Sequence, residues 1–228
     1  MVRLMNIPTL AHFGERLQTT LYSLEQGCRN LKTQRPKPPR KLPYKGRRSR
    51  KFLRDDEVIR LMQAASKVGR NRHRDATLIL MMYRHGLRVS EANALTWENV
   101  DLNVRRLFVR RLKNGKSSIQ VLNEEQTHAL TKLRDDQGER TQAVFVSAQG
   151  EGLTRSTIYK MIARAGKRAG LEVEVNTHML RHSCGHHLTN VRKVDARRIQ
   201  DYLGHRDIRH TVAYTELDEN KFDGLWGD

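Results

Sequence analysis

"YLGHRDIRHTVAYTELD", residues 202–218, places a single tyrosine, Tyr214, after a Gly-His pair in a segment dense with histidine and arginine. Two interpretations of Tyr214 are open at this point. The ring can pack as an ordinary helix residue with its hydroxyl in water, or the hydroxyl can be a nucleophile. The residues found elsewhere in the chain have to decide between them.

The 228-residue chain is strongly basic, with 43 Lys and Arg against 25 Asp and Glu and a formal net charge of +18. This charge favours an anionic partner, most often nucleic acid, over a merely basic surface. The two cysteines, Cys28 and Cys184, make no disulfide framework, and no apolar run is long enough to span a membrane. We therefore expect a cytoplasmic, nucleoid-associated protein that binds DNA and not a membrane.

The N-terminal part of the chain has a composition of its own. Residues 29–51 hold eleven Lys or Arg, no acid and four of the five prolines, so they cannot bury enough apolar surface to fold alone. Before them, residues 10–31 show a weak helical pattern that fits a short docking helix or a fraying extension. We expect residues 1–51 to form a basic, Pro-rich N-terminal arm. Its cations expected to contact DNA are Arg35, Lys37, Arg40, Lys41, Lys45, Arg47, Arg48, Arg50 and Lys51.

From Phe52 onward the hydrophobic pattern is that of a globular domain, residues 52–228. Asn114-Gly115 is a strong turn signal and predicts a β-hairpin. Gly86 is expected to end a helix, and Ser90, Thr154 and Asp195 to cap others. Helices are predicted over 53–66, 74–87, 88–97, 123–136, 154–169, 177–190 and 195–203, and strands over 105–112, 117–122 and 143–147. The expected fold class is α+β, mostly helical, with a small antiparallel sheet.

The densest group of candidate functional side chains is "HMLRHSCGHH", residues 178–187. A zinc site of His182 and His186 is one interpretation, but a metalloprotease helix needs a Glu after the first His, and the stretch contains no acid. A second is phosphate contact by His178 and Arg181, which share one helix face, because Arg donates two parallel hydrogen bonds to phosphate oxygens. Taken alone, the cluster also fits a basic solvated face. We predict no metal and no cofactor.

Two other stretches carry candidate side chains. In "HGLRVSEANALTWENVDL", Arg88 follows a Gly-Leu turn, where it is either a helix-end cap or a functional guanidinium oriented by Glu91. In "RLKNGKSS", Lys113 and Lys116 lie at the tip of the predicted hairpin. A lysine there either reaches into a neighbouring groove or is an ordinary solvated turn residue.

Together, "HGLRVSEA", "RLKNGK", "HMLRHSCG" and "IQDYLGHRDIRHTVAYT" resemble the tyrosine recombinases, also called the phage-integrase family, and most closely the fimbrial phase-variation (Fim-type) DNA invertases. The stretches run in family order and, with their connections, cover about residues 50–228. The last two are long and specific. The chain departs from the larger members upstream, because residues 1–51 are too short and too charged for their separate core-binding domain. The arm is also longer than that of Fim-type members.

The resemblance implies a tyrosine-recombinase-type catalytic domain and a role for each matching residue. Tyr214 would attack a DNA phosphate, forming a 3′-phosphotyrosine and releasing a 5′-hydroxyl without metal or ATP. The two arginines would stabilise the developing charge, and Lys113 would protonate the leaving oxygen. His178 would accept the proton of the tyrosine, with His205 supporting the phosphate or the base. Glu91 would support the first arginine, and Lys116 is a lesser candidate for the lysine role. The implied catalytic residues are Arg88, Lys113, His178, Arg181, His205 and Tyr214.

The resemblance also implies partners: double-stranded DNA at specific recombination sites, a homo-tetramer on two sites, and host DNA-bending proteins. We expect inversion of a segment between short inverted repeats, as in fimbrial phase variation and its transcription regulation. Integration or excision by a phage or mobile-element enzyme is the alternative within the family. A non-catalytic DNA-binding regulator with this fold and a metal-dependent nuclease or protease are alternatives from other classes. Near the C-terminus, Phe222, Leu225 and Trp226 either dock on a neighbouring protomer or pack on their own domain.

Overall fold

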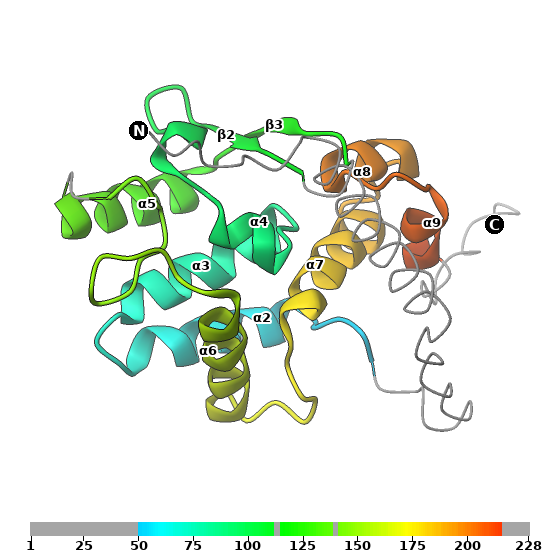
Figure 1. Cartoon of the computed structure of the whole chain (residues 1–228). Helices are drawn as coiled ribbons and strands as arrows, with labels where there is room; N and C mark the ends of the chain where they lie inside the picture. Colours follow the sequence, from blue (N-terminus) through cyan, green and yellow to red (C-terminus); the bar gives the residue numbers. More distant parts are fainter. Residues whose placement is uncertain (1–49, 112–114, 139–140, 216–228) are drawn as a thin grey trace, which may run out of the picture. The chain divides into compact units, whose positions relative to one another are not determined.

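The computed structural model describes residues 50–111, 115–138 and 141–215. It is mostly helical with one small antiparallel sheet (Figure 1), so the predicted fold class is confirmed. The elements are α2 (Asp55–Lys67), α3 (Arg72–Arg84), α4 (Val89–Asn93), the 3₁₀ turn η2 (Trp97–Asn99), β1 (Val100–Asp101), β2 (Arg106–Val109), β3 (Ser118–Val121), α5 (Glu124–Gln137), α6 (Arg155–Arg168), α7 (Thr177–His186), the π-helical turn η4 (His187–Val191), α8 (Ala196–Leu203) and α9 (Arg209–Thr215).

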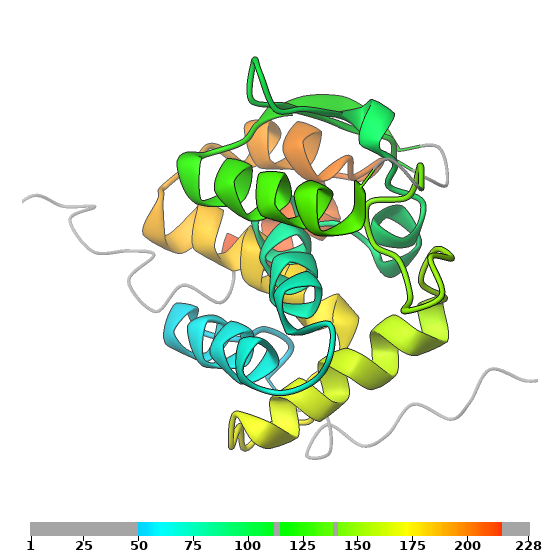
Figure 2. The ribbon, with the colours of Figure 1, turned by 90° about the vertical axis from the view of Figure 1, so that its left-hand side faces the viewer.

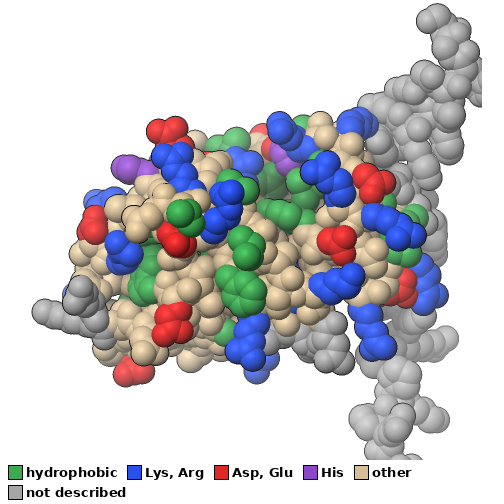
Figure 3. All heavy atoms as spheres, turned by 90° about the horizontal axis from the view of Figure 1, so that it is seen from above, with side chains coloured by type: hydrophobic (Ala, Val, Ile, Leu, Met, Phe, Trp, Pro, Cys, Tyr) green, Lys and Arg blue, Asp and Glu red, His purple; other side chains and the backbone are tan. Residues whose placement is uncertain are grey.

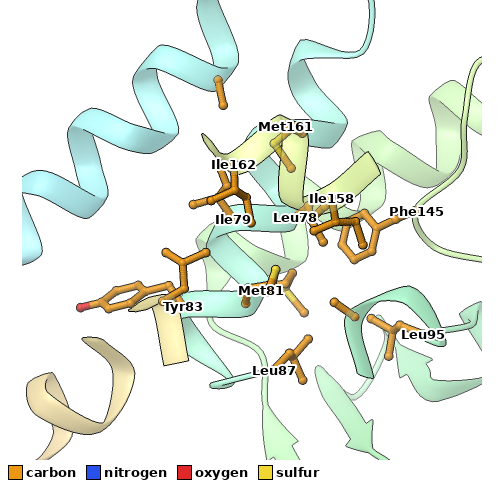
Figure 4. Packing of buried hydrophobic residues seen from close by; sticks show 14 of the residues in the cluster. Leu78, Ile79, Met81, Tyr83, Leu87, Leu95, Phe145, Ile158, Met161 and Ile162 are labelled. Carbon is orange, nitrogen blue, oxygen red and sulfur yellow. The ribbon is translucent and has the colours of Figure 1, made fainter. Parts of the chain in front are cut away.

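Helix α3 forms the middle of the main hydrophobic core. Every residue from Thr77 to Tyr83 is buried, which is the pattern of a helix covered on all sides. Figure 2 shows α3 in the centre, with α5 above it and α2 below. Its side chains share one cluster with those of α6 and with Phe145 (Figure 4). This central helix ends at the turn that leads to Arg88, and it therefore gives that turn a rigid base.

The three strands pair in the order β1-β2-β3, with Phe108 opposite Ile119 on β2 and β3. The predicted hairpin is thus confirmed, while Leu112, Lys113 and Asn114 lie outside the described residues. Leu107 and Val109 face the core, whereas Phe108 and Ile119 are exposed, as the two-residue period of a strand requires. Figure 3 looks down on this side of the molecule and shows hydrophobic side chains among Lys and Arg.

A second, smaller hydrophobic cluster joins α7, α8 and α9. It consists of Cys184 from α7, Ile199 and Leu203 from α8, and Tyr214 from α9. Helix α9 packs on both α7 and α8. Because Tyr214 is the buried aromatic residue of α9, its ring is the main apolar anchor of that helix.

The described chain begins along the side of α7. The backbone N–H of Leu53 donates to Ser183 Oγ at 2.8 Å, and Phe52 stacks on the His186 ring with centroids 3.9 Å apart. Arg50 donates to both carboxylate oxygens of Glu57, at 2.5 and 2.6 Å. Arg50, which the sequence assigns to DNA contact, is therefore paired within the domain.

Most predicted helices and caps are confirmed. The side chains of Thr154 and Asp195 accept hydrogen bonds from the first turns of α6 and α8. Gly86 follows the end of α3 with a φ of 56°, the left-handed conformation that favours glycine at this position. None of the helices in the described ranges is long and apolar enough to cross a membrane.

Four local predictions are wrong. Ser90 is not the cap of α4, because the helix begins at Val89 and its N-cap is Arg88. The helix predicted over 88–97 ends at Asn93, and the one over 177–190 changes to a π-helical turn after His186. Residues 143–147 form no strand and make only isolated bridges. Val144 and Phe145 are apolar because they fill the core, which a β pattern cannot distinguish from a buried strand.

Candidate active site

The turn between α3 and α4 holds Arg88 through a carboxylate. Glu91 Oε1 accepts from the Arg88 guanidinium at 2.7 Å, and Oε2 accepts from the Arg88 backbone N–H at 2.9 Å. The Glu91 side chain is 1% exposed, whereas that of Arg88 is 27% exposed. The buried carboxylate thus holds the guanidinium while part of the Arg88 side chain stays exposed, which is the geometry that the predicted orienting role of Glu91 requires.

Arg111, two residues after β2, is the second partner of Glu91. Its guanidinium lies 2.7 Å from Glu91 Oε2 and its side chain is fully buried. Burial raises the pKa of Glu91, but Arg111 and Arg88 outweigh burial and hold it below its usual value. Glu91 is therefore ionised at neutral pH, as a carboxylate between two arginines should be.

Helix α7 places Arg181 against backbone carbonyls of two other elements. Its two terminal nitrogens donate to Gly86 O at 2.6 Å and to Leu203 O at 2.7 Å. Burial, followed by repulsion from Arg88 and Arg111, lowers the pKa of Arg181 to about 10. Arg181 remains charged at neutral pH, and it brings the α3–α4 turn and the end of α8 to the same place.

Tyr214 packs directly on α7 because position 185 is glycine. A Cβ atom at Gly185 would lie 2.4 Å from Cε2 and 2.6 Å from Cζ of the Tyr214 ring. The tyrosine is 6% exposed. Burial raises its pKa to about 12, although the positive charges of Arg181 and Arg88 act in the opposite direction. The phenol is therefore protonated at neutral pH and lies in the field of both arginines.

Two histidines contact the ring, and a third contacts one of them. His182 meets Tyr214 edge to face with centroids 5.8 Å apart, and His178 meets His182 in the same way at 4.8 Å. The His205 ring lies 6.2 Å from that of Tyr214, centroid to centroid, and its Nδ1 is 2.8 Å from Thr211 Oγ1. His182 thus stands between His178, the predicted proton acceptor, and the tyrosine.

Burial is the main cause of low pKa values in this group. The pKa falls to about 4 for His182 and to about 3 for His205, and that of His178 is also lowered. Neighbouring cationic and histidine side chains add to the effect. All three imidazoles are therefore neutral at pH 7.

The fold brings five of the six predicted catalytic residues together. They come from four parts of the chain: the α3–α4 turn, α7, the end of α8 and α9. Lys113 lies outside the described residues. Lys116, the lesser candidate, is almost fully exposed and lies 3.7 Å from Asp201. The five are Arg88, His178, Arg181, His205 and Tyr214.

The zinc interpretation of His182 and His186 finds no support in their contacts. His186 stacks on Phe52, while His182 contacts His178 and Tyr214. Within the described part of the chain, no three His, Cys, Asp or Glu side chains are arranged to hold a metal ion.

Comparison with known proteins identifies the family. The model of the phage integrase family matches residues 51–221. The type 1 fimbriae regulatory protein FimE of Escherichia coli (strain K12) is 43% identical over 182 residues, which cover 78% of this chain and 91% of FimE. The chain belongs to the phage integrase family.

Two further similar proteins agree with this result. The type 1 fimbriae regulatory protein FimB of the same strain is 39% identical over 183 residues, covering 78% of this chain and 90% of FimB. The crystal structure of XerA recombinase superimposes with a TM-score of 0.66 and 30% identity. That match covers 83% of this chain but only 64% of the XerA chain. The fold described above is thus that of a tyrosine recombinase catalytic domain.

Proposed function

We propose that this tyrosine recombinase cuts and rejoins double-stranded DNA at specific sites through a 3′-phosphotyrosine on Tyr214, and inverts the segment between two short inverted repeats. The observation that carries the proposal is the placement of Tyr214, seated on Gly185, beside neutral histidines and in the field of Arg88 and Arg181. The resemblance to the Fim-type invertases favours inversion over integration or excision.

In the first step, Tyr214 Oη attacks the scissile phosphorus while the bond from phosphorus to the 5′ oxygen breaks. Because burial raises the pKa of the phenol, free phenolate is rare at neutral pH, and the proton has to leave as the oxygen attacks. We assign its acceptance to His178, with His182 between them and His205 supporting the phosphate or the base. Lys113 gives a proton to the leaving 5′ oxygen.

The two arginines supply the charge stabilisation. The open side of Arg88 and the guanidinium of Arg181 would face the non-bridging oxygens, where negative charge develops in the transition state. Attack of a free 5′-hydroxyl on the phosphotyrosine then reverses the chemistry and releases Tyr214. The covalent intermediate conserves the bond energy, so the proposal requires neither ATP nor a metal ion.

The wider proposal covers assembly and organisation. Residues 52–228 form the catalytic domain, and the basic arm, residues 1–51, follows the DNA backbone. Four protomers act on two sites, because each of two duplexes is cut on both strands. Host DNA-bending proteins assist in bringing the sites together, and the protein resides with the nucleoid.

A plasmid assay tests the inversion. The native inverted repeats flanking a short segment are placed on a plasmid, the protein is expressed, and PCR reads both orientations. We expect inversion with the wild type and none with Arg181→Ala or Tyr214→Phe. Integration of a circle into a single site, without inversion, would reassign the protein to the integrases.

A second experiment tests strand cleavage by Tyr214 separately from inversion of the segment. On a nicked site that traps the intermediate, we expect a denaturant-resistant protein–DNA adduct that maps to Tyr214 and survives EDTA. Tyr214→Phe keeps the ring that anchors α9, so it should bind the site and form no adduct. An adduct at another residue, or one that requires zinc, would refute the assigned nucleophile or the metal-free mechanism.

A further inference from the structure

Arg111 is a buried charged residue to which the mechanism above gives no role. It lies two residues after β2, far in sequence from α4 and α7, and its guanidinium is fully buried. A buried guanidinium is costly unless it is paired and hydrogen-bonded, so its contacts show what it supports.

The contacts of Arg111 are with the supports of three proposed catalytic residues. It shares the Glu91 carboxylate with Arg88, at 2.7 Å. It also donates to Gly86 O at 3.3 Å, the carbonyl that accepts from Arg181 at 2.6 Å. The two arginines proposed to contact the phosphate, Arg88 and Arg181, thus each share a hydrogen-bond acceptor with Arg111.

The third support lies just before His205. The aliphatic part of Arg111 runs against Gly204, where a Cβ atom would lie 2.7 Å from Arg111 Cγ. Arg111 also donates to Tyr202 O at 2.7 Å, and to His85 O at 2.9 Å. One guanidinium therefore ties the α3–α4 turn to the C-terminal turn of α8.

We propose that Arg111 is a positioning residue for strand cleavage, which sets the spacing of Arg88, Arg181 and His205 without touching DNA. This inference rests on the function proposed above. Only a planar guanidinium can reach Glu91 and three carbonyls together, because its donors point in fixed, divergent directions. Lysine at this position would keep the charge and lose most of the contacts.

The test compares cleavage of two nicked substrates, one with an ordinary scissile phosphate and one with a methylphosphonate there. The methyl group replaces a charged non-bridging oxygen, so the transition state carries less charge for the arginines to stabilise. For Arg111→Lys we expect roughly 100-fold slower cleavage of the phosphate, the size of effect typical of a misplaced catalytic group. The ratio of wild-type to variant rates should be several-fold smaller on the methylphosphonate, with DNA affinity little changed.

Arg74→Met is the matched control. Arg74 is also a largely buried arginine paired with a carboxylate, Asp75, and with a backbone carbonyl, but it lies at the other end of α3. Its variant should have a lower melting temperature and wild-type rates on both substrates. The corresponding variant Arg111→Met, in which Glu91 keeps its pair with Arg88, should reproduce the substrate-dependent ratio of Arg111→Lys.

The outcomes separate this inference from the proposed function. If the wild type forms no adduct, the proposed function fails. If the wild type cleaves and the Arg111 variants cleave at its rate, or are slowed equally on both substrates, the positioning role is refuted and Arg111 serves only stability.

Discussion

Gly185 makes room for the Tyr214 ring, and its substitution is the sharpest single-residue test of that placement. A helical Gly→Ala change ordinarily gains about 0.5–1 kcal/mol of stability. Here the added methyl would lie 2.4 Å from the ring, and since α7 is packed on the core, the tyrosine has to move. We expect Gly185→Ala to slow adduct formation about 100-fold while DNA binding is retained.

Gly166→Ala is the control for this substitution. Gly166 is also a helical glycine with no space for a Cβ, which would lie 2.6 Å from Val175, but it is in α6. It should lower stability and leave the cleavage rate of the folded protein unchanged. Equal cleavage by Gly185→Ala and the wild type would contradict the seating of Tyr214 on α7.

His85 predicts a pH dependence of stability. Its two ring nitrogens contact Gln120 Oε1 at 2.7 Å and Gln126 Nε2 at 2.8 Å, which fits a neutral ring that donates at one nitrogen and accepts at the other. Burial lowers its pKa from 6.5 to about 4. Between these values the unfolded chain binds the proton and the folded chain does not, so stability falls as the pH decreases from 6.5 toward 4.

The measurement is urea unfolding at several pH values. Protonation linked to His85 should lower the free energy of unfolding of the wild type by on the order of 2 kcal/mol between pH 7.5 and pH 4.5. His85→Asn, whose side-chain amide can replace the donor, should show a smaller loss over the same range. Identical pH profiles for the two proteins would show that His85 does not carry the effect.

At the scale of the elements, the connection between β2 and β3 carries both candidates for the lysine that protonates the leaving oxygen, and substitutions can tell which of them does so. Lys116 is 86% exposed, and its pair with Asp201 at 3.7 Å is of a kind that contributes little to stability. We expect Lys116→Ala to change the cleavage rate only slightly and Lys113→Ala to lower it strongly. A substrate with sulfur at the 5′ leaving position, which needs no general acid, should restore cleavage to Lys113→Ala. Strong loss in Lys116→Ala alone would transfer the role to Lys116.

The sequence predicts the elements better than their contacts. The helices around α3 follow from apolar spacing and from side-chain or glycine caps, which are local properties. The five proposed catalytic residues in the described chain follow from their motifs. Arg111 was missed because its role depends on β2 meeting the α3–α4 turn, and no local spacing encodes that approach. His182 was considered only as a metal ligand, since a contact with Tyr214 requires α9 to fold back on α7.

For the whole molecule, the charge of the arm predicts a salt dependence of DNA binding. Each phosphate contact contributes roughly −0.9 to the slope of log K against log salt concentration. Replacing the cations of the arm by glutamine should flatten that slope by several units and weaken binding to all DNA sequences alike. An unchanged slope would assign the arm to protein contacts. The seven positions to replace are Arg35, Lys37, Arg40, Lys41, Lys45, Arg47 and Arg48, while Arg50 is kept because it pairs with Glu57.

The side chain that anchors α9 is also the one proposed to become bonded to DNA. While the phosphotyrosine exists, the ring cannot leave the broken strand, and the end of the described chain is fastened to the nucleic acid as well as to α7. A protomer in this state cannot dissociate from its half-site without first rejoining a strand. The cut DNA end therefore stays bound to the protein for as long as the break exists. The protein is released from that end in the same step that rejoins the strand.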